Sequence, residues 1–176
     1  MTSEEIVEKV QSLLGEDVLE AAVSLGDAVI HVAPEKLPKV AKFVKEDPHL
    51  NFDYLSQITG VDYLDMDREP RFEAVYELHS MDKNHSLRIR VGLPEDDPSV
   101  PTVSDLWKGA LFPEMELYDM YGFDIPGHPN LKRLLMPEDW EGHPLRRDVP
   151  LMTEEIAFSH NRDFKDELVK SKPPTR

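Results

Sequence analysis

Cysteine is absent from this chain of 176 residues, and its absence excludes several kinds of redox and metal centre. Iron–sulfur clusters are held by cysteine thiolates, c-type haem is attached through thiols, and structural zinc sites usually include at least two cysteines. Disulfide bonds are excluded as well, so the composition gives no indication of an oxidising compartment. We therefore expect a protein that has no redox centre of its own.

Long apolar runs and positive charge are also scarce. No stretch approaches the roughly 20 apolar residues that a membrane span requires, and the start, MTSEEIVEKV, is acidic where a secretory signal is basic and then apolar. Lys and Arg number 20 against 35 Asp and Glu, and the resulting formal charge of −15 repels nucleic-acid phosphates and anionic lipids. We expect no nucleic-acid partner, and contact with a membrane only through another protein. Acidity that simply keeps the chain soluble is the alternative.

The apolar pattern predicts an α+β two-layer sandwich with helices on one face of a sheet. In chain order the expected elements are a helix from Thr2 to Gly15, strands at 18–25 and 28–32, a helix from Pro34 to Asp47, and strands at 55–63, 72–79 and 87–91. Gly26-Asp27 suits a tight reversal between the first two strands, and the last two strands should pair around 81–84.

The chain divides into four parts on composition. Residues 1–93 form the sandwich, and residues 94–122 form a proline-rich linker and a helix that begins near Ser104, breaks or restarts at Pro113 and ends at Gly122. Residues 123–151 are interrupted by prolines yet rich in apolar side chains, so this segment must lie on the sandwich or on a partner protein. Residues 152–176 form a charged tail.

Opposite charges gather at the boundary between the last expected helix and the irregular segment. Spacing places Glu116 and Asp119 on one helical face, close to Glu114. The irregular segment supplies Arg133, Arg146 and Arg147, whose planar guanidinium groups can each grip a carboxylate with two hydrogen bonds. The pattern indicates an ion-pair network that holds irregular backbone in one shape. Solvated surface charges are the alternative.

Two histidines in the same region each precede a proline. His128 and His143 could bind a metal with Asp119, Asp139 or Asp148, because imidazole and carboxylate ligands suit zinc and iron. The histidines lie 15 positions apart on irregular chain, unlike the paired histidines of a helical metal site. A hydrogen-bonded structural role is favoured.

We expect different environments for the two tryptophans. Trp107 shares a helical face with Ala110 and Leu111, which favours a place in the core. Trp140 lies among acidic residues of the irregular segment, where partner contact and packing on the chain itself are equally good explanations.

At these residues the chain resembles a known family. The run EMELYDMYGFDIPGHPNLKRLL, followed by PEDWEGHPLRRDVPL, resembles the signature of the 30 kDa subunit of respiratory complex I, which in bacteria is the C subunit of NADH:quinone oxidoreductase. Related subunits occur in membrane-bound hydrogenases and F420H2 dehydrogenase. Met115 departs from the pattern, because the family usually has arginine between the two glutamates; Arg147 and Val149 are milder changes.

The resemblance implies a cofactor-free, non-catalytic subunit of a proton-translocating NADH:quinone oxidoreductase. It implies a place in the peripheral arm, on the cytoplasmic side of the membrane, against the quinone-site (49 kDa-type) subunit and the iron–sulfur subunits. Iron–sulfur clusters, FMN or quinone would then belong to partner subunits. No catalytic, cofactor-binding or metal-binding residue is expected in this chain.

Two groups of residues follow from this interpretation. The expected partner contacts are Leu131, Arg133, Leu134, Leu135, Trp140, His143, Arg146 and Arg147. The expected structural motif consists of Glu114, Glu116, Asp119, Gly122, His128 and Pro129. The first alternative is the equivalent subunit of a membrane-bound hydrogenase or F420H2 dehydrogenase. A free-standing metal-dependent hydrolase built on the two histidines and nearby aspartates, and an acidic module that binds partners transiently, are the others.

Overall fold

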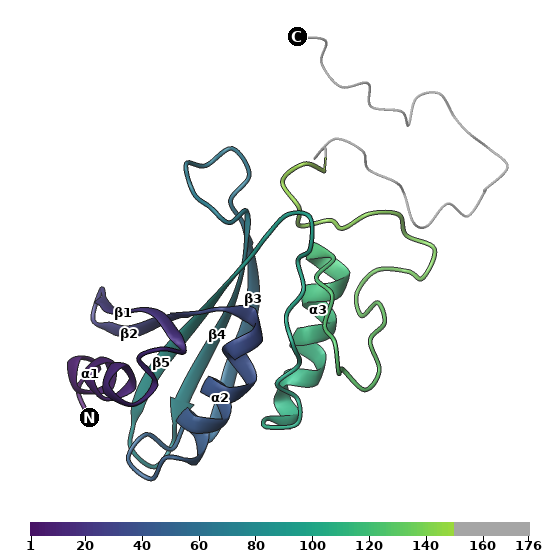
Figure 1. The fold of residues 1–176 in the computed structure, drawn as a ribbon. Coiled ribbons are helices and arrows are strands. Elements are labelled where there is room, and N and C mark those ends of the chain that lie inside the picture. Colours follow the sequence, from purple (N-terminus) through teal and green to yellow (C-terminus); the bar gives the residue numbers. More distant parts are fainter. Residues whose placement is uncertain (150–176) are drawn as a thin grey trace, which may run out of the picture.

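The computed structural model describes residues 1–149 and shows a mixed α+β fold (Figure 1). The elements are α1 (Ser3–Leu14), β1 (Val18–Ser24), β2 (Asp27–Val32), η1 (Pro34–Lys36), α2 (Leu37–Glu46), β3 (Tyr54–Asp62), β4 (Phe72–Ser80), β5 (His85–Leu93), η2 (Lys108–Ala110) and α3 (Leu111–Tyr121). The expected α+β fold class, with a helix after the strands and irregular chain beyond it, is confirmed. The expected tail at 152–176 lies outside the described residues, as do the last two residues of the irregular segment.

The five strands form one sheet in the order β1-β2-β5-β4-β3. Neighbouring strands are antiparallel except for β2 and β5, which run parallel. The β4–β5 hairpin closes between Ser80 and His85, where the sequence predicted a reversal. The alternation of apolar side chains along these two strands puts one face of the sheet towards the helices.

The main core lies between that face and helices α1 and α2. Ile6, Val10 and Leu14 of α1 are buried together with Val40 and Val44 of α2, since in both helices these positions recur every three or four residues. A capping box between Thr2 and Glu5 starts α1, as the sequence predicted. Trp107 belongs to the same core, which confirms the expectation for that residue.

Two local predictions were wrong. The β1–β2 turn is Leu25-Gly26 instead of Gly26-Asp27, because Asp27 pairs with Ser24 as the first residue of β2. Pro113 does not break the third helix; it lies in the first turn of α3, where the missing N–H group would have had no partner in the helix. The helix therefore begins at Leu111, seven residues after the expected start near Ser104.

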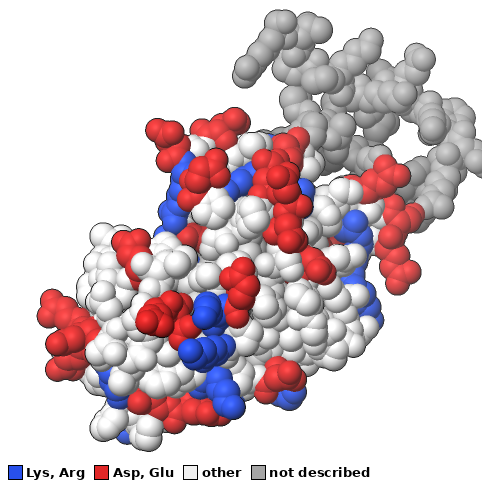
Figure 2. All heavy atoms as spheres, in the orientation of Figure 1, with Lys and Arg blue, Asp and Glu red and all other residues white. Residues whose placement is uncertain are grey.

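On the face that Figure 2 displays, Asp and Glu side chains form several clusters between broad uncharged areas and occupy more of the surface than Lys and Arg. Among residues 1–149, no helix is long and apolar enough to cross a membrane.

Candidate functional site

Residues 123–149, which we call the strap, leave the end of α3 and return across it towards the sheet (Figure 1). Gly122 ends α3 in the left-handed conformation at a φ of 72°, and its N–H donates to the carbonyl of Tyr118 at 2.9 Å. A Cβ atom at this position would stand 2.5 Å from His143 Nε2 and 2.8 Å from an Arg146 nitrogen. Only glycine lets the chain turn here and lets the strap come this close.

Asp119 is the first anchor of the strap, and its side chain is fully buried. Its Oδ1 accepts a hydrogen bond from Arg133 Nη1 at 2.8 Å. Its Oδ2 accepts from the consecutive backbone N–H groups of Leu134, Leu135 and Met136, at 3.0, 2.7 and 2.9 Å. Burial by itself would raise the pKa of Asp119, but these hydrogen bonds outweigh it and hold the pKa below its usual value.

Further contacts hold the middle of the strap to the end of α3. Arg133 Nη2 donates to the carbonyls of Trp140 at 2.8 Å and Gly142 at 3.2 Å, which closes the loop between them. The Nδ1 of His143 donates to the carbonyl of Asp119 at 3.0 Å. Arg146 Nε donates to the carbonyl of Tyr121. The strap is therefore joined to the last turn of α3 by side chains that donate to backbone carbonyls of the helix.

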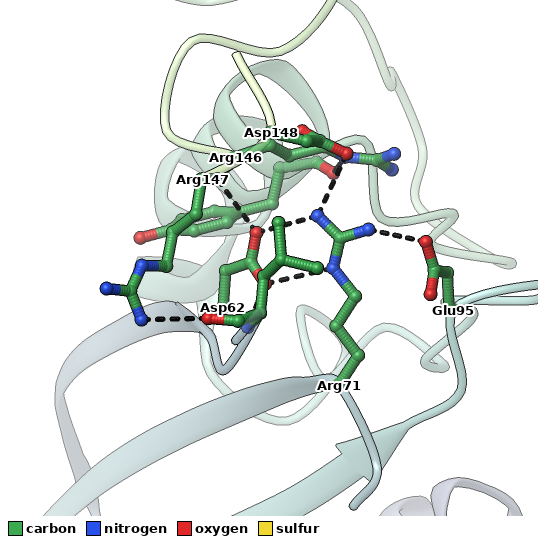
Figure 3. Close-up of polar contacts among 8 residues, drawn as sticks. Asp62, Arg71, Glu95, Arg146, Arg147 and Asp148 are labelled. Carbon is green, nitrogen blue, oxygen red and sulfur yellow. Dashed lines mark hydrogen bonds and ion pairs between the residues drawn. The ribbon is translucent and has the colours of Figure 1, made fainter. Parts of the chain in front are cut away.

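Arg71, directly before β4, is the second anchor (Figure 3). Its Nε and Nη2 donate to the two oxygens of Asp62 at 3.0 and 2.9 Å. Nη2 also donates to Asp148 of the strap at 2.9 Å, and Nη1 donates to Glu95. The N–H of Arg147 donates to Asp62 at 2.9 Å. A single buried guanidinium thus joins two strand ends, the linker and the far end of the strap.

The pKa values of this cluster follow from the same contacts. Burial alone would raise the pKa of Asp62, yet the hydrogen bonds from Arg71, and then those from the backbone of Arg147 and Leu64, lower it from 3.8 to about 2. The bonds to Asp62, Asp148 and Glu95 raise the pKa of Arg71. The Asp62–Arg71 pair is therefore fully charged at neutral pH.

Glu114 forms a third buried contact, which joins α3 to the segment after β5. Its Oε1 accepts from the N–H of Val103 at 2.7 Å, and its Oε2 accepts from the hydroxyl of Thr102 at 2.5 Å. His128 Nε2 lies 3.9 Å from Oε2 and donates to the carbonyl of Leu111 at 3.1 Å. Burial raises the pKa of Glu114 above its usual value despite these hydrogen bonds.

The outer surface of the strap carries apolar side chains without cover from the described part of the chain. Leu135 is 63% exposed and Leu145 is 49% exposed. Leu131, Leu134 and Trp140 are only partly buried. The polar anchors of the strap therefore turn towards the chain itself, whereas part of its apolar surface turns outwards.

The structure brings several of the predicted residues together. Arg133 pairs with Asp119, His143 lies on the end of α3, and both His128 and His143 donate to backbone carbonyls. Glu116 and Asp119 do not share an environment as their spacing suggested, because Glu116 is exposed and Asp119 is buried. Whether Arg133, Arg146, Arg147 and His143 also touch a partner stays a prediction, as does every other expected partner contact.

Sequence reasoning missed Asp62, Arg71 and Glu95. Arg71 stands 77 positions before Asp148, so no local spacing connects the two. The available signal was the position of Asp62 and Arg71 at the ends of apolar strands, where charged side chains need partners. Among residues 1–149, no group of three or more His, Asp or Glu side chains is arranged to hold a metal ion.

Comparison with known proteins agrees with this architecture. Residues 30–155 match the family model of the respiratory-chain NADH dehydrogenase 30 kDa subunit. The C subunit of NADH-quinone oxidoreductase from Roseiflexus castenholzii is 48% identical over 158 residues, which cover 90% of each chain. The trypsin-resistant fragment of Nqo5 is 33% identical and superposes with a TM-score of 0.65 over 74% of this chain and all of the fragment. A chain of the membrane-bound sulfane sulfur reductase, an archaeal respiratory membrane complex, shares the fold at 23% identity, with a TM-score of 0.71 over 92% of this chain and 97% of that one.

Proposed function

The chain belongs to the family of the respiratory-chain NADH dehydrogenase 30 kDa subunit, and from this membership we propose that it is a cofactor-free structural subunit of an NADH-quinone oxidoreductase. It lies in the peripheral arm on the cytoplasmic side of the membrane and reaches the membrane only through the complex. Neighbouring subunits perform the electron and proton chemistry in this proposal, and the lack of cysteine in this chain means that any iron–sulfur cluster belongs to them.

The outward apolar surface of the strap is the observation that carries this proposal. The Asp119 and Arg71 anchors hold the strap through its polar groups, so Leu135 and Leu145 remain exposed on backbone that is already fixed in place. Apolar side chains on a preformed surface bind a partner without the entropy cost of ordering a loose segment. The strap is therefore a docking surface.

The partners we propose are the quinone-site subunit and the adjacent iron–sulfur subunits. Leu131, Leu134, Leu135 and Trp140 supply apolar contact area, and the exposed Leu145 extends it. Trp140 suits the centre of such a contact, because tryptophan combines a large apolar ring with one hydrogen-bond donor. Arg133, Arg146 and Arg147 hold the strap in one conformation, so its apolar side chains keep a fixed orientation.

The double variant Leu135→Asp/Leu145→Asp tests this surface in the full chain. Both side chains are exposed, so the variant should unfold at the same temperature as the wild type while its recovery with the other subunits falls at least about ten-fold. Met81→Asp, which also places a carboxylate at an exposed apolar position but in the β4–β5 connection, is the matched control and should leave assembly unchanged. Normal stoichiometry of the double variant in the purified complex would refute the docking role of the strap.

A further inference from the structure

Leu25, at the tip of the β1–β2 hairpin, has a conformation and an exposure that the fold does not require. Its φ is 53°, followed by 94° at Gly26, the pair of positive angles that a tight hairpin turn needs. Among residues 1–149 the other non-glycine residues with positive φ are Asn51, Asp65 and Asn84, whose polar side chains tolerate this region. Leucine has no such compensation, and this one is fully exposed. Folding would be served better by asparagine or glycine.

The turn is held in a defined position. Ser3 Oγ donates to the carbonyl of Gly26 at 2.6 Å, which ties the hairpin tip to the start of α1. Leu25 is therefore a fixed apolar projection and not the end of a loose loop. A strained residue that the surrounding structure holds in place points to a function at that residue.

The strand that leads to Leu25 is an open edge of the sheet. β1 is the outermost strand on this side, and residues Val18–Ser24 contain no lysine, arginine or proline that would discourage another strand from pairing. A bulge near Leu19 leaves residues 20–24 in regular register with β2, and within residues 1–149 β1 pairs with no strand on its outer side. Leu19 and Val23 of this strand are exposed, Leu19 to 74%.

We propose that the β1 edge and Leu25 form a second docking surface, which receives an extended strand from a different subunit. This inference rests on the proposed function, because it requires a multisubunit complex. The incoming strand carries apolar side chains for Leu19, Val23 and Leu25, and basic side chains for the exposed carboxylates of Glu16 and Glu20.

The charges favour a different subunit over a second copy of this chain. Residues 13–27 contain no lysine or arginine, and the whole chain carries a formal charge of −15. Asp17 and Asp27 are already paired with Lys36, Lys39 and Arg88. Glu16 and Glu20, however, are exposed, and two copies paired edge to edge would bring these carboxylates together. A basic strand of another polypeptide meets no such repulsion.

Leu25→Asn gives a test with two effects of opposite sign. Asparagine suits the positive φ, so the melting temperature of the isolated full chain should rise by roughly 2–6 °C. Recovery of the variant in the assembled complex should fall about ten-fold when it competes with wild-type subunit during assembly, because an apolar anchor is lost. Met81→Asn, which removes an exposed apolar side chain from the other hairpin connection, should change neither quantity appreciably. A Leu25→Asn chain that competes equally with wild type overturns the proposal.

A photo-crosslinking residue at position 23 identifies the occupant in the purified complex. The expected product joins position 23 to a segment of another subunit that contains lysine or arginine and alternating apolar residues. A crosslink to a second copy of this chain, or no crosslink to protein, overturns the proposal. Wild-type subunit that does not enter a large complex at all would instead refute the proposed function, so the two failures are distinct.

Discussion

The guanidinium of Arg71 lies 2.9 Å from the carboxylate of Asp148, which stands 77 positions further along the chain. This contact joins the start of β4 to the far end of the strap, and the Asp119 anchor joins the end of α3 to its middle. Irregular backbone with many prolines has no hydrogen-bond ladder of its own, so fixed side-chain anchors must define its path. The strap is therefore fixed on the rest of the chain before a partner binds.

Arg71→Met should be strongly destabilising. The change leaves the buried carboxylate of Asp62 without its main partner, and removal of one member of a buried ion pair costs about 3–5 kcal/mol of unfolding free energy. Urea denaturation measures this loss. Arg88→Met is the matched control, because Arg88 pairs with Glu77 on a partly exposed part of the sheet and such pairs contribute about 1 kcal/mol or less. Equal losses in the two variants would mean that Arg71 is not an anchor.

Gly122→Ala should displace the strap. The new Cβ atom would meet His143 Nε2 at 2.5 Å and would also force alanine into a φ of 72°. Gly26→Ala is the matched control, since Gly26 has a φ of 94° but no atom within 4 Å of the added Cβ atom. We expect the control to lose about 1 kcal/mol of unfolding free energy and Gly122→Ala to lose at least about 1 kcal/mol more. Equal losses would show that the strap moves aside without cost.

The elements with local signals were predictable from the sequence. The capping box at Thr2 and Glu5, the alternation along β4 and β5 and the helix stop at Gly122 each depend on neighbouring residues, and the structure has all three. The parallel pairing of β2 with β5 and the Arg71–Asp148 contact depend on how distant segments pack, which spacing does not encode. The hairpin turn was misplaced by one residue because turn propensities favour aspartate over leucine at positive φ, and here leucine occupies that position.

Asp119→Asn should loosen the middle of the strap while α3 remains folded. The carboxamide has one acceptor oxygen and cannot accept from three backbone N–H groups and from Arg133 at once. Hydrogen exchange at Leu134, Leu135 and Met136 should accelerate at least about ten-fold, the equivalent of about 1.4 kcal/mol of local opening free energy. The amides of β4 serve as the internal control and should keep their protection. Unchanged exchange at 134–136 would contradict the role of Asp119.

Stability should fall in acid because of Asp62. Its pKa is about 2 in the folded chain against an ordinary value of 3.8, so the unfolded state binds the proton more readily. The stabilisation is complete above roughly pH 5 and is lost as the pH falls through 4 towards 2, with a total of about 2 kcal/mol. Unfolding free energies measured across this range for wild type and Asp62→Asn isolate the effect, since the other carboxylates are common to both. Parallel pH profiles of the unfolding free energy in the two proteins would exclude this contribution of Asp62.

The contribution of Glu114 to the unfolding free energy should change with pH in the opposite direction. Burial raises its pKa, so the folded state holds the proton more tightly than the unfolded state and the ionised carboxylate costs stability as the pH rises above its ordinary pKa of 4.5. Glu114→Gln removes this ionisation and keeps an oxygen that can accept from the N–H of Val103.

The stability of Glu114→Gln relative to wild type should therefore increase from pH 4 to pH 8, as thermal melts at both values would show. Glu116→Gln, on the exposed side of the same helix, is the matched comparison, and a trend of the same size in that variant would mean that burial is not the cause. If Glu114→Gln loses stability relative to wild type as the pH rises, the ionised carboxylate is favoured by its contacts with Thr102 and His128, and burial is not the dominant influence on it.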